Sequence, residues 1–299
     1  NLKNSNINET NEASVSLLHV ACANGKLDAV QFLLSQENLL KNSCNSVDRM
    51  AQTPLLATCA AEFEDSTISQ MNERVQVVRY LVSRDDVDPN LTDCDGETPF
   101  INACREGNLK CIQALIEGCS NHHTININAM NDNRECGLLV AVKANNNVEL
   151  VKYLLNLPSI NVNQCDDDGE SPLFVASERE NKEIVDLLLH RGNAKDTLHS
   201  AVLRNDMTVL KNLVEVEEVN INQKQGAAGT ALHVACLYKK LISVQYLIAL
   251  PSIQMNVVDK DGRTALFYAC EYGYEHIVEA LLACKELDVN VKGFNHVLD

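Results

Sequence analysis

The sequence predicts an all-α fold in which about eight pairs of short helices stack on one another. One block of six residues, often of the form Thr-Pro-Leu-x-x-Ala, recurs along the 299-residue chain, and a more apolar block follows each copy. In six of the eight copies, the last residues of the two blocks are 13 positions apart. A period near 33 residues has the length of one turn and two helices, so the chain is predicted to be an array of repeats.

The first block predicts the first helix of each repeat. Its opening Thr or Ser is suited to cap a helix, and the Pro that often follows is tolerated in the first turn. Gly25, Gly107 and Gly273 lie just past three copies, where a left-handed residue usually ends a helix. The copies span 16–21, 53–58, 98–103, 136–141, 171–176, 196–201, 230–235 and 264–269.

The second block predicts the second helix, because its apolar residues recur at helical spacing. Asn closes most repeats, and Asp-Gly at 95–96, 168–169 and 261–262 precedes the next first block, a pattern that suits a hairpin turn. The copies of the second block span 29–34, 77–82, 111–116, 150–155, 184–189, 209–214, 243–248 and 277–282.

These blocks together resemble the ankyrin-repeat family. The resemblance implies a solenoid of stacked helix-turn-helix pairs with β-hairpin tips. It assigns residues 1–13 to an N-terminal linker segment, 14–290 to the ankyrin-repeat domain and 291–299 to a truncated ninth repeat. Because the chain begins without Met, we expect it to be a piece of a longer protein.

Three departures from the pattern are informative. Repeat two carries about eleven extra residues within 60–73, a polar and acidic insertion that either contacts a partner or lengthens a helix. Only six residues separate Leu189 from the next first block, where other repeats use fifteen, so repeat six is expected to lack its hairpin and to stack differently on repeat five. The segment 118–124 is longer than its equivalents and predicts an exposed loop.

Composition narrows the classes of function. A net charge of −16 argues against nucleic acid as a partner, and no run of ~20 apolar residues is present to enter a membrane. Five of the twelve Cys (Cys22, Cys59, Cys104, Cys236 and Cys270) share one repeat position and predict buried thiols, which favours a reducing cytoplasm or nucleus.

No motif predicts catalysis. The chain lacks Gly-x-Ser-x-Gly, phosphate-binding and zinc-protease signatures, and no Cys-x-x-Cys pair suggests a metal. The run 166–169 fails as a calcium loop because Val175 stands where the bidentate Glu is needed. His19, His199 and His233 share one helix position and are predicted to bond the backbone of a neighbouring repeat. We therefore expect no enzyme activity, no cofactor and no metal.

The resemblance implies that a protein partner meets the hairpin tips and the first helices on the concave face. Tyr and Arg often anchor interfaces, and an acidic surface attracts a partner with a basic segment. The candidate partner-binding residues are Leu237, Tyr238, Arg263, Tyr272 and Tyr274 near the end of the chain, and Asp167, Asp168, Glu170, Glu178 and Arg179 in its middle.

Two functions stay open at this point. The first is a non-catalytic scaffold or adaptor that binds another protein. The second is the cytosolic ankyrin domain of a larger membrane channel or enzyme, with ligand sensing in a loop between repeats. The flanking sequence distinguishes the two.

Overall fold

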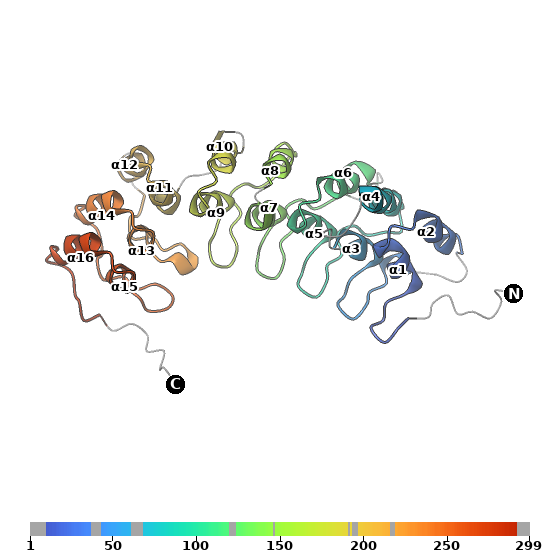
Figure 1. The fold of residues 1–299 in the computed structure, drawn as a ribbon, viewed down its shortest axis with the longest axis horizontal. Helices are drawn as coiled ribbons and strands as arrows, with labels where there is room; N and C mark the ends of the chain where they lie inside the picture. The colour runs from blue at the N-terminus through green and yellow to red at the C-terminus, as the bar shows by residue number, and fades with distance from the viewer. Residues whose placement is uncertain are drawn as a thin grey trace. The chain divides into compact units, whose positions relative to one another are not determined.

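The computed structural model describes residues 10–36, 43–60, 68–119, 124–145, 147–190, 192, 197–215 and 219–291. Within these ranges it contains sixteen α-helices and two short 3₁₀ helices, which confirms the all-α prediction. The chain divides into two compact units, Asn1–Asn161 and Val162–Asp299, each with four helix pairs (Figure 1).

In each repeat the first helix carries an odd number and the second an even number. The N-terminal unit holds α1 (Leu17–Ala23), α2 (Leu27–Leu34), α3 (Pro54–Cys59), α4 (Ile68–Val82), α5 (Pro99–Arg105), α6 (Leu109–Gly118), α7 (Gly137–Asn145) and α8 (Val148–Leu155). The C-terminal unit holds α9 (Pro172–Glu178), α10 (Lys182–His190), α11 (Leu198–Arg204), α12 (Met207–Glu215), α13 (Ala231–Leu237), α14 (Leu241–Ile248), α15 (Ala265–Glu271) and α16 (Glu275–Leu282).

Most first helices begin where the sequence predicts, whereas that of repeat six is capped one residue later, by Thr197. The hydroxyls of Thr53, Thr98 and Ser171 each accept the backbone N–H three residues on, and Pro occupies the first turn. Past the helix ends, Gly25 and Gly273 adopt φ of +68° and +65°, the left-handed conformation that glycine tolerates best.

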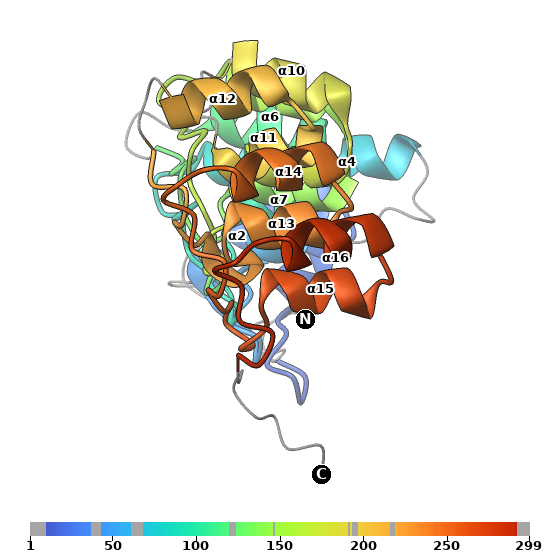
Figure 2. The ribbon, with the colours of Figure 1, turned by 90° about the vertical axis from the view of Figure 1, so that its left-hand side faces the viewer.

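Helices of the same kind pack on one another from repeat to repeat within each unit. In the C-terminal unit α9, α11, α13 and α15 form one row. In the other row α14 packs on α16 (Figure 2). Leu56, Ile101, Leu139 and Leu247 are buried completely between the helices. The core is therefore a series of contacts between neighbouring repeats rather than one central cluster.

We call the loop before each first helix a finger. The expected β-hairpin is reduced to a single antiparallel bridge in four fingers, Thr10–Ser16, Met130–Cys136, Lys224–Thr230 and Val258–Thr264. An Asn or Asp five residues before the helix cap closes most tips: Asn11 Oδ1, for example, accepts the N–H groups of Ala13 and Val15. Residues 10–13, expected to be linker, thus form part of the first finger.

The Asn that closes a repeat bonds the next repeat rather than its own turn. The side-chain amide of Asn90 donates to the Thr124 carbonyl (2.8 Å), and its oxygen accepts the Asn126 N–H (2.8 Å). The same pair of bonds recurs at Asn45, Asn128, Asn222 and Asn256. These side-chain amides form hydrogen bonds with backbone groups that lie outside the helices.

The described part of the insertion in repeat two lengthens a helix. α4 begins at Ile68 and runs for 15 residues, and Glu73 in its early turns pairs with Lys26 of repeat one (2.9 Å). The rest of the insertion, with Phe63, and the pair His122-His123 lie outside the described residues. Among the described helices, none is long and apolar enough to cross a bilayer.

The recurring thiols are buried in four repeats and exposed in one. Burial raises the pKa of Cys22 and Cys236 to about 12, and Cys59 and Cys104 are equally enclosed. The prediction is wrong for Cys270, which is exposed because no described helix pair covers the far side of repeat eight.

Candidate functional site: a missing finger and an aromatic surface

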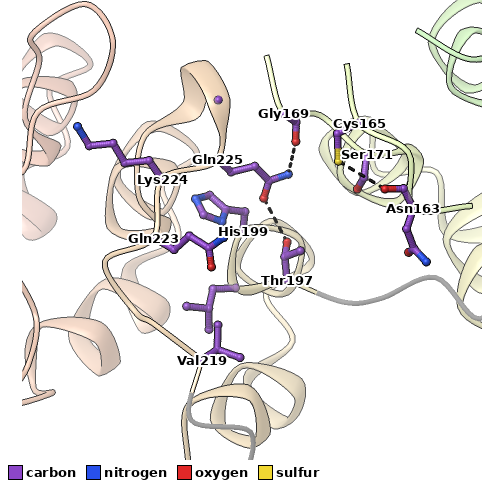
Figure 3. A pocket seen from close by; sticks show the side chains of 12 residues that line it. Asn163, Cys165, Gly169, Ser171, Thr197, His199, Val219, Gln223, Lys224 and Gln225 are labelled. Atoms are coloured by element: carbon purple, nitrogen blue, oxygen red, sulfur yellow. Dashed lines mark hydrogen bonds between the residues drawn. The ribbon is translucent and has the colours of Figure 1, made fainter. Parts of the chain in front are cut away.

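All ten candidate partner-binding residues fall in the C-terminal unit, whose repeat six has no finger. α10 ends at His190 and the next helix cap is Thr197, so too few residues remain for a hairpin. In repeat seven, Gln225 replaces the Asn or Asp that closes most other tips. Its longer side chain donates to the Gly169 carbonyl of finger five (2.9 Å) and accepts the Thr197 hydroxyl (3.3 Å), as Figure 3 shows. Fingers five and seven are thereby joined directly.

Two glycines make this contact possible. Gly226, at φ +48°, lies against finger five so closely that a Cβ would overlap the Asp168 carbonyl oxygen. That oxygen accepts the Ala227 N–H (3.2 Å). A Cβ on Gly169 would lie 2.8 Å from the Gly226 nitrogen, so a side chain at either glycine would collide with the backbone of the opposite finger.

A cavity of about 470 Å³ remains beside this bridge. Its lining combines the polar side chains of Asn163, Ser171, Thr197, His199 and Gln223 with apolar surface that includes Val219 (Figure 3). A second cavity, of about 840 Å³, lies between α10 and α12 and is walled by Val185, Leu189 and Leu203. One cavity thus lies near the beginning of α11 and the other near its end.

Tyr272 and Tyr274 form a stacked pair, with ring centroids 5.8 Å apart. Tyr272 is 51% exposed, and the Lys239 ammonium lies 5.3 Å from the Tyr274 ring centroid. Stacked rings beside a cation offer a large contact area that loses little entropy when it binds.

Tyr238 is held more firmly than the sequence suggests. Its hydroxyl donates a short hydrogen bond to the Glu178 carboxylate, which lies two repeats away on α9. Burial, then the bond to Glu178, raises the pKa of Tyr238 well above its usual range. Leu237 beside it is half-buried. Glu178 and Tyr238 are therefore fixed in place before any partner arrives.

Arg263 stands over an aromatic residue that the sequence analysis missed. Its guanidinium carbon lies 5.3 Å from the ring centroid of Phe267, which is 46% exposed, and 5.8 Å from that of Tyr268. Phe267 occupies the block position of His19 and His233, which are buried against the next repeat, and it is exposed, like Cys270, because no described helix pair covers it. We call Leu237, Tyr238, Arg263, Phe267, Tyr272 and Tyr274 the aromatic surface.

The acidic candidates lie on finger five and at the end of α9. Asp167 and Asp168 are exposed at the tip, and Asp168 pairs with Lys260 of finger eight (2.7 Å). Glu170 is half-buried, and Arg179, past the helix end, is exposed. The three fingers that remain in this unit therefore converge around an acidic tip that is only partly neutralised.

Nothing in the described ranges gathers three or more His, Cys, Asp or Glu side chains in a way that suits a metal ion. The geometry supports recognition by contact: a bridged pair of fingers, exposed aromatic rings and fixed charges.

Comparisons with known proteins identify the family and the fold. The family model described as ankyrin repeats in three copies matches residues 18–131, 66–164, 119–197 and 198–293. The chain therefore belongs to the ankyrin-repeat family, and ankyrin repeats indicate a protein-interaction module, a fold that is generally non-catalytic. The ankyrin repeat domain of Bcl-3 has the same fold, with a TM-score of 0.55 and 23% identity over 91% of this chain and 100% of that one.

The curated relatives are longer proteins. An ankyrin repeat-containing protein of Schizosaccharomyces pombe is 29% identical over 37% of this chain and 42% of its own length. Human transient receptor potential cation channel subfamily A member 1 is 24% identical over 70% of this chain and 18% of its own. Palmitoyltransferase AKR1 of Lachancea kluyveri is 25% identical over 67% of this chain and 26% of its own length. The chain thus spans less than half the length of these relatives.

Proposed function

We propose that this chain is a non-catalytic binding module that recognises a protein partner through the aromatic surface of repeats seven and eight. The partner carries a basic segment that the acidic tip of finger five attracts. Net charge −16 disfavours nucleic acid, and the buried thiols favour a reducing compartment, the cytoplasm or nucleus.

The observation that carries the proposal is the exposure of Tyr272, which stacks on Tyr274 beside Lys239. Exposed aromatic clusters often mark interaction sites, and Tyr and Arg are enriched among residues that dominate interface energy. Because Tyr238 is already anchored by Glu178, little entropy is lost when it is covered.

The test uses affinity capture from extract with this chain as bait, followed by affinity measurement with the captured protein. Changing both Tyr238 and Tyr272 to Ala should weaken binding by ~2 kcal/mol or more, about thirtyfold. Tyr246→Ala is the matched control, because Tyr246 lies on α14 in the other row of helices. Equal affinity of the double variant and the control would assign binding to another surface.

The alternative is that this chain is the ankyrin portion of a larger channel or enzyme. It is supported by the similarity to a cation channel and a palmitoyltransferase, of which the chain matches only 18% and 26%. The full-length transcript decides it: a membrane-spanning or catalytic segment next to these repeats would favour this reading.

A further inference from the structure

The aromatic surface repeats with the period of the fold. Tyr238 directly follows α13 and Tyr272 directly follows α15, so the two rings hold equivalent places in repeats seven and eight. These two helices pack on each other. Because packed helices lie ~8–10 Å apart, equivalent side chains on them are separated by about the same distance. A ligand that contacts both rings in the same way therefore needs a repeat of about 9 Å.

The polyproline II helix has this repeat. It has about three residues per turn and rises ~3.1 Å per residue, so every third residue returns to the same side after ~9.3 Å. An α-helix advances ~5.4 Å per turn, and a β-strand returns to the same face after ~6.6 Å, so neither matches the spacing in a single step. Prolines at positions i and i+3 of an extended segment fit Tyr238 and Tyr272 in turn.

Both rings are held in place before a ligand arrives. Tyr272 stacks on Tyr274, with centroids 5.8 Å apart, and the Lys239 ammonium lies 5.3 Å from the Tyr274 centroid. Tyr272 is still 51% exposed, so much of its ring remains open to a ligand. Tyr238 is anchored by its bond to Glu178. Ordered aromatic rings of this kind form the surfaces on which polyproline II segments dock.

The polar groups beside these rings are able to donate hydrogen bonds. Within the described part of the chain, the Tyr272 and Tyr274 hydroxyls have no hydrogen-bond partner, and the Lys239 ammonium only donates. An ordinary extended segment presents both N–H and C=O groups, whereas each proline presents only the carbonyl. The carbonyls of a polyproline II helix have no internal partner, so they are available to accept these bonds.

We propose that the aromatic surface binds a proline-rich segment of the partner in the polyproline II conformation, with prolines three positions apart on Tyr238 and Tyr272. The inference rests on the proposed function and names the chemistry of the bound segment. Because the Glu178 carboxylate lies at the Tyr238 hydroxyl, a Lys or Arg of the partner is favoured next to the prolines at this end. The proline-rich stretch and the basic segment are then continuous.

Fluorescence anisotropy of labelled oligoprolines with the whole chain tests the spacing. The probes contain three, six or nine prolines between pairs of arginines, and a six-residue Gly-Ser peptide between the same arginines is the charge-matched control. Six prolines span ~18.6 Å and reach both rings, whereas three span one turn. We expect saturable binding of the six-proline probe with a Kd below about 1 mM and binding of the three-proline probe at least about tenfold weaker. Nine prolines should bind within about threefold of six.

Variants locate the bound probe. Changing both Tyr238 and Tyr272 to Ala should weaken the six-proline probe at least about tenfold, and Tyr272→Phe, which keeps the ring and loses one donor, about fivefold. Glu178→Gln should weaken it about threefold at low salt and reduce its salt dependence, because a charge is lost while an acceptor for Tyr238 is kept. Tyr246→Ala, in the other row of helices, is the matched control and should leave the affinity unchanged.

The proposal is overturned if no oligoproline binds at up to ~1 mM, or if the Gly-Ser peptide binds as tightly as six prolines. It is also overturned if affinity shows no step between three and six prolines, or if the Tyr variants bind like Tyr246→Ala. These outcomes leave the proposed function standing where the captured partner still loses affinity in the double Tyr variant. The proposed function fails on a different result, an unchanged affinity of the captured partner for that variant.

Discussion

Replacing Gln225 by Ala tests whether the finger bridge stabilises the C-terminal unit. The change removes two side-chain hydrogen bonds, to the Gly169 carbonyl and from the Thr197 hydroxyl, and leaves the backbone of finger seven unaltered. Each bond contributes ~0.5–1.5 kcal/mol, and both freed groups can reach water through the adjacent cavity. We therefore expect a local destabilisation of about 1–2 kcal/mol.

Hydrogen exchange is the suitable assay, because a repeat array need not unfold in one step and a global midpoint would dilute a local effect. The Ala227 amide, which donates to the Asp168 carbonyl across the bridge, should exchange about tenfold faster in Gln225→Ala. Amides of α15 should keep their rates. Gln223→Ala, at an exposed neighbour in the same finger, is the control. Unchanged exchange at Ala227 would show that the two glycines alone hold the fingers together.

Three further predictions concern stability. Leu281→Ala should cost ~2–5 kcal/mol in urea unfolding, whereas Leu282→Ala, at a side chain 54% exposed against 0% for Leu281, should cost under about 1; equal costs would refute the packing described for α16. Burial lowers the pKa of His199 to about 4 in the folded chain, against ~6.5 in the unfolded chain. The unfolded chain therefore binds a proton first as the pH falls, and the free energy of unfolding declines between pH 6.5 and pH 4 by at most about 3 kcal/mol. His199→Gln should therefore make the free energy of unfolding depend less on pH between pH 7 and 4.5. A pH dependence as steep as the parent's would contradict the burial of a neutral His199. Glu180→Gly should stabilise by about 0.5–1 kcal/mol, because Glu180 holds φ at +55°; a loss of stability in thermal melts would exclude strain there.

The fold could be predicted from the sequence because the helices of each repeat are specified by residues within that repeat. Thr98 and Pro99 specify a helix start without reference to the rest of the chain, and eight copies make the period unmistakable. Bonds between repeats are harder to foresee. Asn90 suits its own turn equally well, so the sequence does not predict that its amide bonds the Thr124 carbonyl of the next repeat.

The exposure of the candidate residues could be predicted from the sequence, but the bonds that they form could not. Tyr272 is as exposed as expected, but the bond from Tyr238 to Glu178 joins residues 60 positions apart in repeats that are not neighbours in the sequence. The substitution of Gln225 for Asn or Asp is visible in the sequence as an exception. The bond from Gln225 to Gly169 cannot be predicted in this way, because the two residues are 56 positions apart and the distance between their fingers is set by the fold.

Hydrogen exchange of the complex with the captured partner tests the central claim most directly. If the aromatic surface of repeats seven and eight binds the partner, amides of α13 and α15 and of the finger between Val258 and Thr264 should slow on binding. Those of α14 and α16, in the other row, should change little. Protection confined to α14 and α16, or to the N-terminal unit, would contradict the account.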